Sequence, residues 1–194
     1  MDTRKTRTWA EVSLGALRHN VEEMQRALPD GCGLLGVVKA DAYGHGASEI
    51  AAALRECGCR YLAVACPQEA LALRNAGETM PILILGAVDA AFASDMAAND
   101  ITLSVECAEK GRALSAALRG GERLRIHLKL DTGMGRLGFR VQDETALREA
   151  AAAAQLPNLR AFSPTSPFPT RPARRNIPPR SSRCFSPRSK SWKP

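Results

Sequence analysis

The 194-residue sequence has no long apolar run and no recognisable secretory leader. None of its stretches approaches the ~18 consecutive apolar residues of a transmembrane helix, which excludes a protein that crosses a membrane by helices. Its first residues, MDTRKTRTWAEV, carry charge but lack the apolar core of a signal peptide. We therefore expect a cytoplasmic protein without a membrane partner.

The six cysteines lack the spacing of a metal or redox site. Cys57 and Cys59 form a C-x-C pair, whereas zinc and thioredoxin-like sites use C-x-x-C. No second thiol pair and no cluster of the three histidines lies at ligand spacing. We expect no metal ion.

Acidic residues are missing from the C-terminal segment. Residues 164–194 hold eight of the 27 basic residues, eight of the 12 prolines and no acid, so the rest of the chain carries 19 basic residues against 20 acidic ones. Such a composition cannot bury enough apolar surface to offset the entropy of ordering. We expect a folded domain over residues 1–162 and a disordered tail over 163–194. The tail's Ser/Arg character suits phosphate contacts, but only Phe185 and Trp192 are there to stack bases, so we favour a solvated tail and no nucleic-acid partner.

The remainder alternates short aliphatic runs with Ala-, Leu- and Glu-rich stretches that favour helix. The aliphatic runs are Gly33–Val38, Tyr61–Ala65, Ile82–Leu85, Ile101–Val105 and Leu124–Leu130, with a weaker one near Leu159–Phe162. The helical stretches are Leu14–Ala27, Ala47–Glu56, Gln68–Asn75, Asp89–Ala98, Ala108–Leu118 and Asp143–Ala154. This alternation predicts parallel strands with helical crossovers.

Two α/β architectures fit, an open doubly wound sheet and a (β/α)8 barrel. The open sheet usually carries a Gly-rich phosphate loop after its first strand, and none is present here. We favour the barrel. A complete barrel needs about 250 residues and eight strands, so the prediction is an incomplete (β/α)8 barrel of about six units.

The first segment with candidate catalytic residues is VVKADAYGHG, Val37–Gly46. Lys39 directly follows a buried strand, the place where barrel enzymes put catalytic groups. Desolvation there favours the neutral amine that Schiff-base chemistry needs, and Tyr43 offers a hydroxyl to a phosphate. The alternative is a strand-end lysine that extends into solvent.

The second segment is HLKLDTGMGRLGF, His127–Phe139. Lys129 lies on a late strand, and Arg136 follows in a glycine-rich loop that can fold back over the strand ends. The fork of an arginine suits a carboxylate, although a surface ion pair is the alternative. An aspartic-protease interpretation of Asp131-Thr132-Gly133 fails, because those enzymes are all-β and pair two carboxylates.

Together these segments resemble the alanine racemase family, bacterial enzymes of fold type III that use pyridoxal 5'-phosphate (PLP) and combine an N-terminal barrel with a C-terminal β domain. The opening TWAEVSLGALRHNVEEMQ is also typical, and the resemblance covers about residues 7–162. It implies PLP as cofactor and an isomerase that interconverts L- and D-alanine, supplying D-alanine for peptidoglycan. It also implies homodimers whose active sites include residues of the partner's C-terminal domain.

The resemblance further implies residue roles. Lys39 corresponds to the Schiff-base lysine and to the base that moves the Cα proton on one face. Tyr43 corresponds to a phosphate-contacting tyrosine, and Arg136 to an arginine near the cofactor's phenolic oxygen and the substrate carboxylate. Lys129 matches a lysine that is carbamylated in many members, where the carbamate holds that arginine. We interpret His127 as a strand residue.

After Leu159 the family pattern G-x-[FY]-[ST]-H-F is lost. Codons for this stretch, read one base out of frame, can spell GIFSHFSVSDE, so we interpret the tail as out-of-frame sequence and expect a truncated, inactive racemase. Two alternatives stay open, a PLP-binding barrel protein without racemase activity and a protein that binds nucleic acid through its tail.

Overall fold

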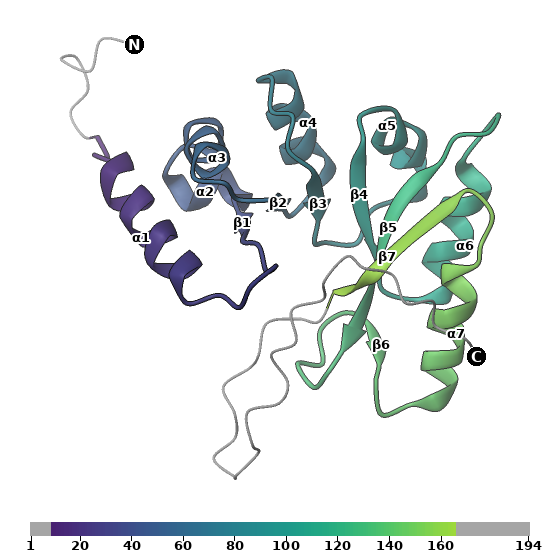
Figure 1. Ribbon diagram of the computed structural model, residues 1–194. Coiled ribbons are helices and arrows are strands. Elements are labelled where there is room, and N and C mark those ends of the chain that lie inside the picture. The colour runs from purple at the N-terminus through teal and green to yellow at the C-terminus, as the bar shows by residue number, and fades with distance from the viewer. Residues whose placement is uncertain (1–8, 166–194) are drawn as a thin grey trace, which may run out of the picture.

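A computed structural model describes residues 9–165, in which one curved sheet of parallel strands is covered by helices (Figure 1). The strands are β1 (Leu35–Val37), β2 (Tyr61–Val64), β3 (Ile82–Ile84), β4 (Ile101–Val105), β5 (Leu124–Asp131), β6 (Phe139–Arg140) and β7 (Leu159–Thr165). The helices are α1 (Leu14–Arg26), α2 (Lys39–Gly44), α3 (Ala47–Glu56), α4 (Pro67–Asn75), the short 3-10 helix η2 (Ala90–Phe92), α5 (Ala93–Ala98), α6 (Ala108–Ala117) and α7 (Glu144–Ala154).

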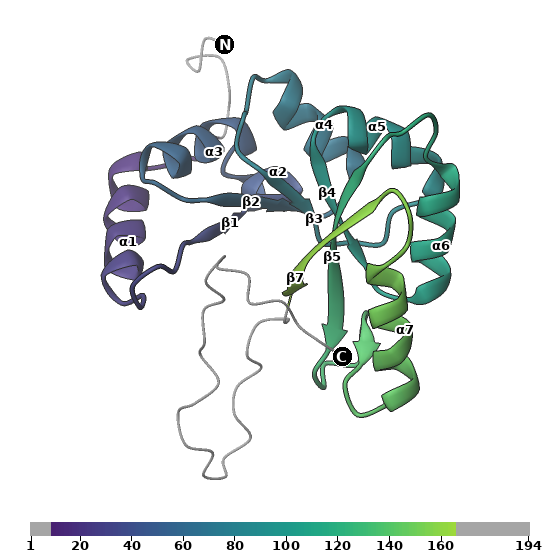
Figure 2. The ribbon, with the colours of Figure 1, turned by 45° about the vertical axis from the view of Figure 1, so that its right-hand side comes forward.

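Strand order follows the chain from β1 to β5, and both β6 and β7 pair with β5. All pairs are parallel, as the alternation of strands and helices predicts. Figure 2 shows the helices on the outer side of the curved sheet, with the strands converging inside. This arrangement confirms the predicted α/β barrel architecture.

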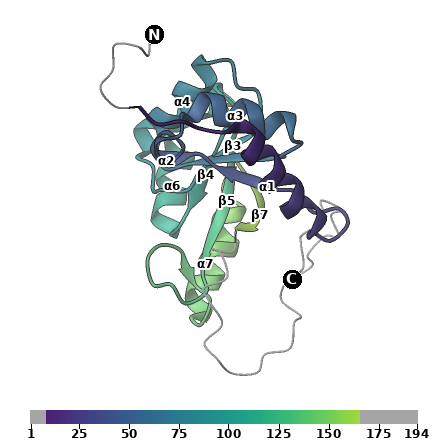
Figure 3. The same ribbon diagram turned by 90° about the vertical axis from the view of Figure 1, so that its left-hand side faces the viewer.

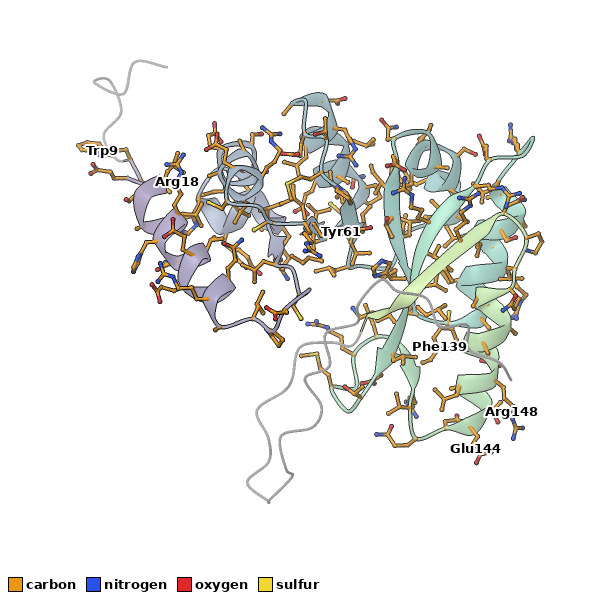
Figure 4. All side chains as sticks on the ribbon, viewed as in Figure 1. Trp9, Arg18, Tyr61, Phe139, Glu144 and Arg148 are labelled. Atoms are coloured by element: carbon orange, nitrogen blue, oxygen red, sulfur yellow. The ribbon has the colours of Figure 1, made fainter. Side chains whose placement is uncertain are left out.

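The strands bury both faces. Leu62, Ile84 and Leu103 belong to the core beneath the helices, while Ala63 and Leu83, equally inaccessible to solvent, alternate with them on the other side. Tyr61, labelled in Figure 4, projects from β2 with its ring 6.0 Å from that of His127 on β5. The interior of the curved sheet is thus filled by side chains, as in barrels generally.

The sheet does not close within the described residues. β1 pairs only with β2 and β7 only with β5, and the first and last strands of the sheet lie apart (Figures 1 and 2). Figure 3 views the sheet from the side of α1. Helix α1 lies at the β1 end, where its Arg18 forms an ion pair with Glu56 of α3. The structure is therefore the incomplete barrel that the sequence predicts.

Helix ends follow ordinary capping chemistry. Ser13 accepts a hydrogen bond from the Ala16 amide at the start of α1, and Asp143 accepts two from the first turn of α7. Among residues 9–165, no helix has the length and apolar character needed to cross a membrane.

Three features differ from the expected boundaries. A left-handed turn, α2, occupies residues 39–44, which were expected to be loop, and the short strand β6 follows the glycine-rich segment. Strand β7 continues to Thr165, past the boundary expected at 162, because long β5 offers ladder partners as far as Lys129. The rest of the expected tail lies outside the described residues.

Candidate active site

Lys39 lies at the carboxyl end of β1, two residues beyond the strand's last residue. The Val38 amide still donates to the Ala63 carbonyl at 2.8 Å, so the β1–β2 ladder extends to the residue before the lysine. Val38 is buried, whereas Lys39 is only partly exposed. The strand therefore carries the Lys39 backbone to the rim of the sheet and leaves its amine accessible there.

The chain after Lys39 makes one turn of left-handed helix. Ala40, Asp41, Ala42 and Tyr43 have φ values of 50°, 54°, 51° and 57°. Because each such residue costs roughly 1–2 kcal/mol, four in succession need support from their surroundings. Ala42 is buried, and the Asp41 carboxylate accepts the Ala47 amide at 2.7 Å, where α3 begins. The turn brings the Tyr43 ring to 5.8 Å from the Lys39 Nζ.

Two backbone amides at the strand ends share one carboxylate. Glu69, in the first turn of α4, accepts the Ala40 amide on Oε1 and the Ala65 amide on Oε2, each at 2.7 Å. Ala65 directly follows β2. Glu69 therefore bridges the ends of the first two strands beside Lys39.

Lys129 projects from β5 toward the same end of the sheet. Its Nζ donates to the Leu85 carbonyl, which directly follows β3, at 3.2 Å. Burial lowers the pKa of Lys129, and the positive charges of Arg136 and Lys39 lower it further, whereas Glu106 raises it. Lys39, Arg136 and Glu106 therefore all act on the charge of Lys129.

Glu106 directly follows β4, and the register that pairs Val105 with Leu128 makes Glu106 and Lys129 lateral neighbours. Its Oε2 is buried and makes no hydrogen bond among the described residues. A buried carboxylate oxygen without a donor is costly, so this atom is a natural acceptor at the rim.

The loop with Arg136 folds back onto β5. Asp131 accepts the amides of Gly135 and Gly133, which hold the pKa of its carboxyl below the ordinary value. Gly138 has a φ of 129°, and a Cβ there would lie 2.7 Å from the Lys129 carbonyl oxygen. The backbone of the loop thus lies directly on the strand that carries Lys129, and Arg136 itself is exposed.

Lys39 follows the carboxyl end of β1, Lys129 projects to the same end of the sheet, and Arg136 is close enough to Lys129 to affect its pKa. Tyr43 lies beside Lys39 but is 62% exposed. A cavity of about 380 Å³ is lined by residues within 11–20 and by Val37, Ala42, His45 and Ile50, and by none of the three cations. His127 is a strand residue whose pKa burial lowers. Among the described residues no group of three metal-ligating side chains gathers.

The chain is similar to known proteins over most of its length. The family profile described as "Alanine racemase, N-terminal domain" matches residues 12–171. This chain belongs to the alanine racemase family. It is 47% identical over 138 residues to the alanine racemase of Geobacillus stearothermophilus and 41% identical over 152 residues to that of Desulforamulus reducens. The matches cover 71% and 78% of this chain but only 36% and 41% of those proteins.

Solved structures of alanine racemases share the fold. The enzyme of Clostridium difficile 630, in complex with cycloserine, superposes with a TM-score of 0.81 at 35% identity, over 86% of this chain and 46% of that chain. A histidine racemase from Leuconostoc mesenteroides superposes with a TM-score of 0.68 at 30% identity, over 78% of this chain and 41% of that one. The chain thus spans less than half the length of the relatives it matches.

Proposed function

We propose that this chain is the PLP-binding portion of an alanine racemase, a cytoplasmic isomerase that interconverts L- and D-alanine and supplies D-alanine for the cell wall. The observation that carries the proposal is the grouping of Lys39, Lys129 and Arg136 at one rim of the barrel, in a member of this family. Barrel enzymes gather their reacting groups at this rim.

The side chains present fit PLP chemically. The primary amine of Lys39 suits an aldehyde, and the hydroxyl of exposed Tyr43 suits a phosphate. Lys39, Lys129 and Arg136 offer positive charge to an anionic cofactor and to an anionic amino-acid carboxylate, and Glu106 and Glu69 are carboxylates at the same strand ends. When bound, PLP supplies the electron sink that stabilises a carbanion at the substrate Cα.

The remaining steps belong to the chain's own residues. Lys39 holds the cofactor and then, as a free amine, accepts or returns the Cα proton on one face of the substrate. Arg136 pairs with the substrate carboxylate, since the exposed guanidinium has room for a bidentate contact. The sequence has two tyrosines, Tyr43 and Tyr61, both in the first two βα units. In the family that the chain belongs to, we expect the second base, on the opposite face, to be a tyrosine of the C-terminal domain, which neither Tyr43 nor Tyr61 matches.

We further propose that Lys129 forms a carbamate, in which its neutral amine adds to CO2 and releases a proton. Burial and the neighbouring cations lower the pKa of Lys129, which increases the neutral fraction that reacts. The product is an anion that can attract Arg136. This would convert a repelling cation into a partner that orients the substrate-binding arginine.

The proposal is tested with the 194-residue polypeptide and PLP. We expect borohydride to trap one PLP on Lys39, Lys39→Ala to abolish trapping, and Tyr43→Phe to weaken retention only. Lys110→Ala, on the covering helix α6 and not on a strand of the sheet, is the matched control. Loss of trapping in the control, or its persistence in Lys39→Ala, would overturn the assignment.

We expect racemisation of L-alanine by the same polypeptide to be slow, because neither of its two tyrosines matches the expected second base, and such acid–base assistance is worth about 10²–10⁴-fold. L-Histidine serves as a second substrate, since a structural relative is named a histidine racemase. The C-terminal half of a relative is then added to the same mixture. PLP trapped on Lys39 with no turnover of either amino acid, before or after this addition, would favour a PLP-binding barrel protein without racemase activity.

A further inference from the structure

We infer that Glu69 is a positioning residue for Lys39, a clamp that holds the ends of β1 and β2 together and thereby sets the direction of the lysine. This inference rests on the proposed role of Lys39 and adds to it a group on a different element, helix α4. Glu69 touches neither cofactor nor substrate in this account. It acts through the backbone.

The geometry distinguishes the clamp from a surface carboxylate. Each Glu69 oxygen accepts one amide at 2.7 Å, Ala40 on one and Ala65 on the other. Both amides lie just past the last ladder bond between these strands, from Val38 to Ala63. The carboxylate therefore continues the β1–β2 connection beyond the last ladder bond. Each of its two oxygens accepts one backbone amide, as a backbone carbonyl does within a ladder.

The clamp matters because a strained turn begins directly after Lys39. Ala40 is the first residue of the left-handed turn, whose four residues are each in an unfavourable conformation. A charge-assisted bond to the Ala40 amide fixes the peptide that joins Lys39 to this turn. Releasing that bond frees the turn to relax to ordinary backbone angles, which would move both Lys39 and Tyr43.

The neighbouring strand end leaves little room for adjustment. At Gly86, just past β3, a Cβ would lie 2.5 Å from the Ala65 carbonyl oxygen. Glu69 thus accepts the amide of Ala65, and Gly86 lies against the carbonyl of the same residue. The other amide that Glu69 accepts, that of Ala40, is the one directly attached to Lys39.

The competing explanation for Glu69 is interaction with the helix dipole, because it lies in the first turn of α4. Glu109 occupies the corresponding first turn of α6 and is exposed, which makes it a matched control for charge alone. Glu69→Asp separates the explanations, since it keeps the charge at the helix start but is too short to reach both amides.

The experiment is residue-resolved amide exchange on the full chain without cofactor. Glu69→Gln offers one carbonyl oxygen, and its NH2 group would face the other amide N–H. We expect exchange at Ala40 and Ala65 to accelerate about 10- to 100-fold in Glu69→Gln and Glu69→Asp, as for loss of a bond to a charged group. Leu62, bonded to the Pro81 carbonyl, and the Glu109→Gln variant should be unaffected.

The second readout is the rate of reductive methylation of Lys39 by formaldehyde, relative to Lys110. We expect this ratio to change at least threefold in both Glu69 variants and not in Glu109→Gln. Wild-type exchange rates in Glu69→Asp would support the dipole explanation and overturn the clamp. Faster exchange with an unchanged Lys39 rate would overturn the positioning role. Neither readout uses PLP, so failure of PLP trapping on Lys39 would count against the proposed function alone.

Discussion

Gly138→Ala tests whether the arginine loop is held by close packing on β5. Gly138 has a φ of 129°, and an added Cβ would lie 2.7 Å from the Lys129 oxygen, 2.8 Å from the Asp131 nitrogen and 2.9 Å from the Leu130 carbonyl carbon. All three atoms belong to backbone, so no flexible side chain can move aside. We expect the loop to lift from the strand and the protein to lose stability.

Gly133→Ala is the matched control, since Gly133 has a φ of 132° and an added Cβ there meets nothing within 4 Å. Both variants carry the cost of alanine at positive φ, roughly 1–3 kcal/mol. Only Gly138→Ala adds the cost of forced backbone displacement, about 1–3 kcal/mol. The free energy of unfolding should therefore fall further in Gly138→Ala by about 1–3 kcal/mol.

Urea unfolding followed by circular dichroism measures this difference. With an m-value of about 2 kcal/mol/M, the midpoints of the two variants should differ by roughly 0.5–1.5 M. Unchanged m-values would show that the denatured state is unaffected. Equal midpoints for the two alanine variants would refute the argument. The cost of alanine at positive φ would then account for the whole loss of stability, and the close approach of loop and strand would not exist.

Three further predictions concern charged groups. Arg74→Lys should destabilise the protein by about 2 kcal/mol or more in urea unfolding, because a lysine cannot donate to all four carbonyls that the guanidinium reaches, those of Glu78, Met80, Asn99 and Asp100. Burial lowers the pKa of His127, so the unfolded chain binds the proton more readily; stability should decline as pH falls below about 6.5, and His127→Asn should flatten this decline in pH-dependent thermal unfolding. In buffer with ¹³C-bicarbonate, NMR should show a carbamate resonance that Lys129→Arg removes and Lys110→Arg retains.

The strands and most helices were predictable from sequence, because aliphatic runs indicate strands and Ala-, Leu- and Glu-rich stretches indicate helices without reference to distant residues. Aliphatic runs bounded by glycine became buried parallel strands, and α3 occupies the expected Ala47–Glu56. The left-handed turn was not predictable, since Ala40, Asp41 and Ala42 have no local preference for positive φ. Its conformation depends on tertiary contacts, including the bond from the Ala40 amide to Glu69, 29 positions away.

The rim was only partly predictable for a related reason. Lys39 and Arg136 stand in long motifs, so their sequence context identifies them. Glu69 looks like an ordinary acidic residue at a helix start, and nothing local indicates that both oxygens face strand ends. Glu106 likewise follows a strand without any motif, and only the β4–β5 register places it beside Lys129.

The charges at the rim also explain why its residues depend on one another. Burial and the two cations lower the pKa of Lys129 and favour its neutral amine. Glu106 raises the pKa and favours the ammonium form. Removing Glu106 would therefore favour the neutral form, and removing Arg136 would favour the charged one. Lys39 and Arg136 are thus coupled through Lys129, whose charge both of them affect. An anion near these three groups would stabilise their positive charges.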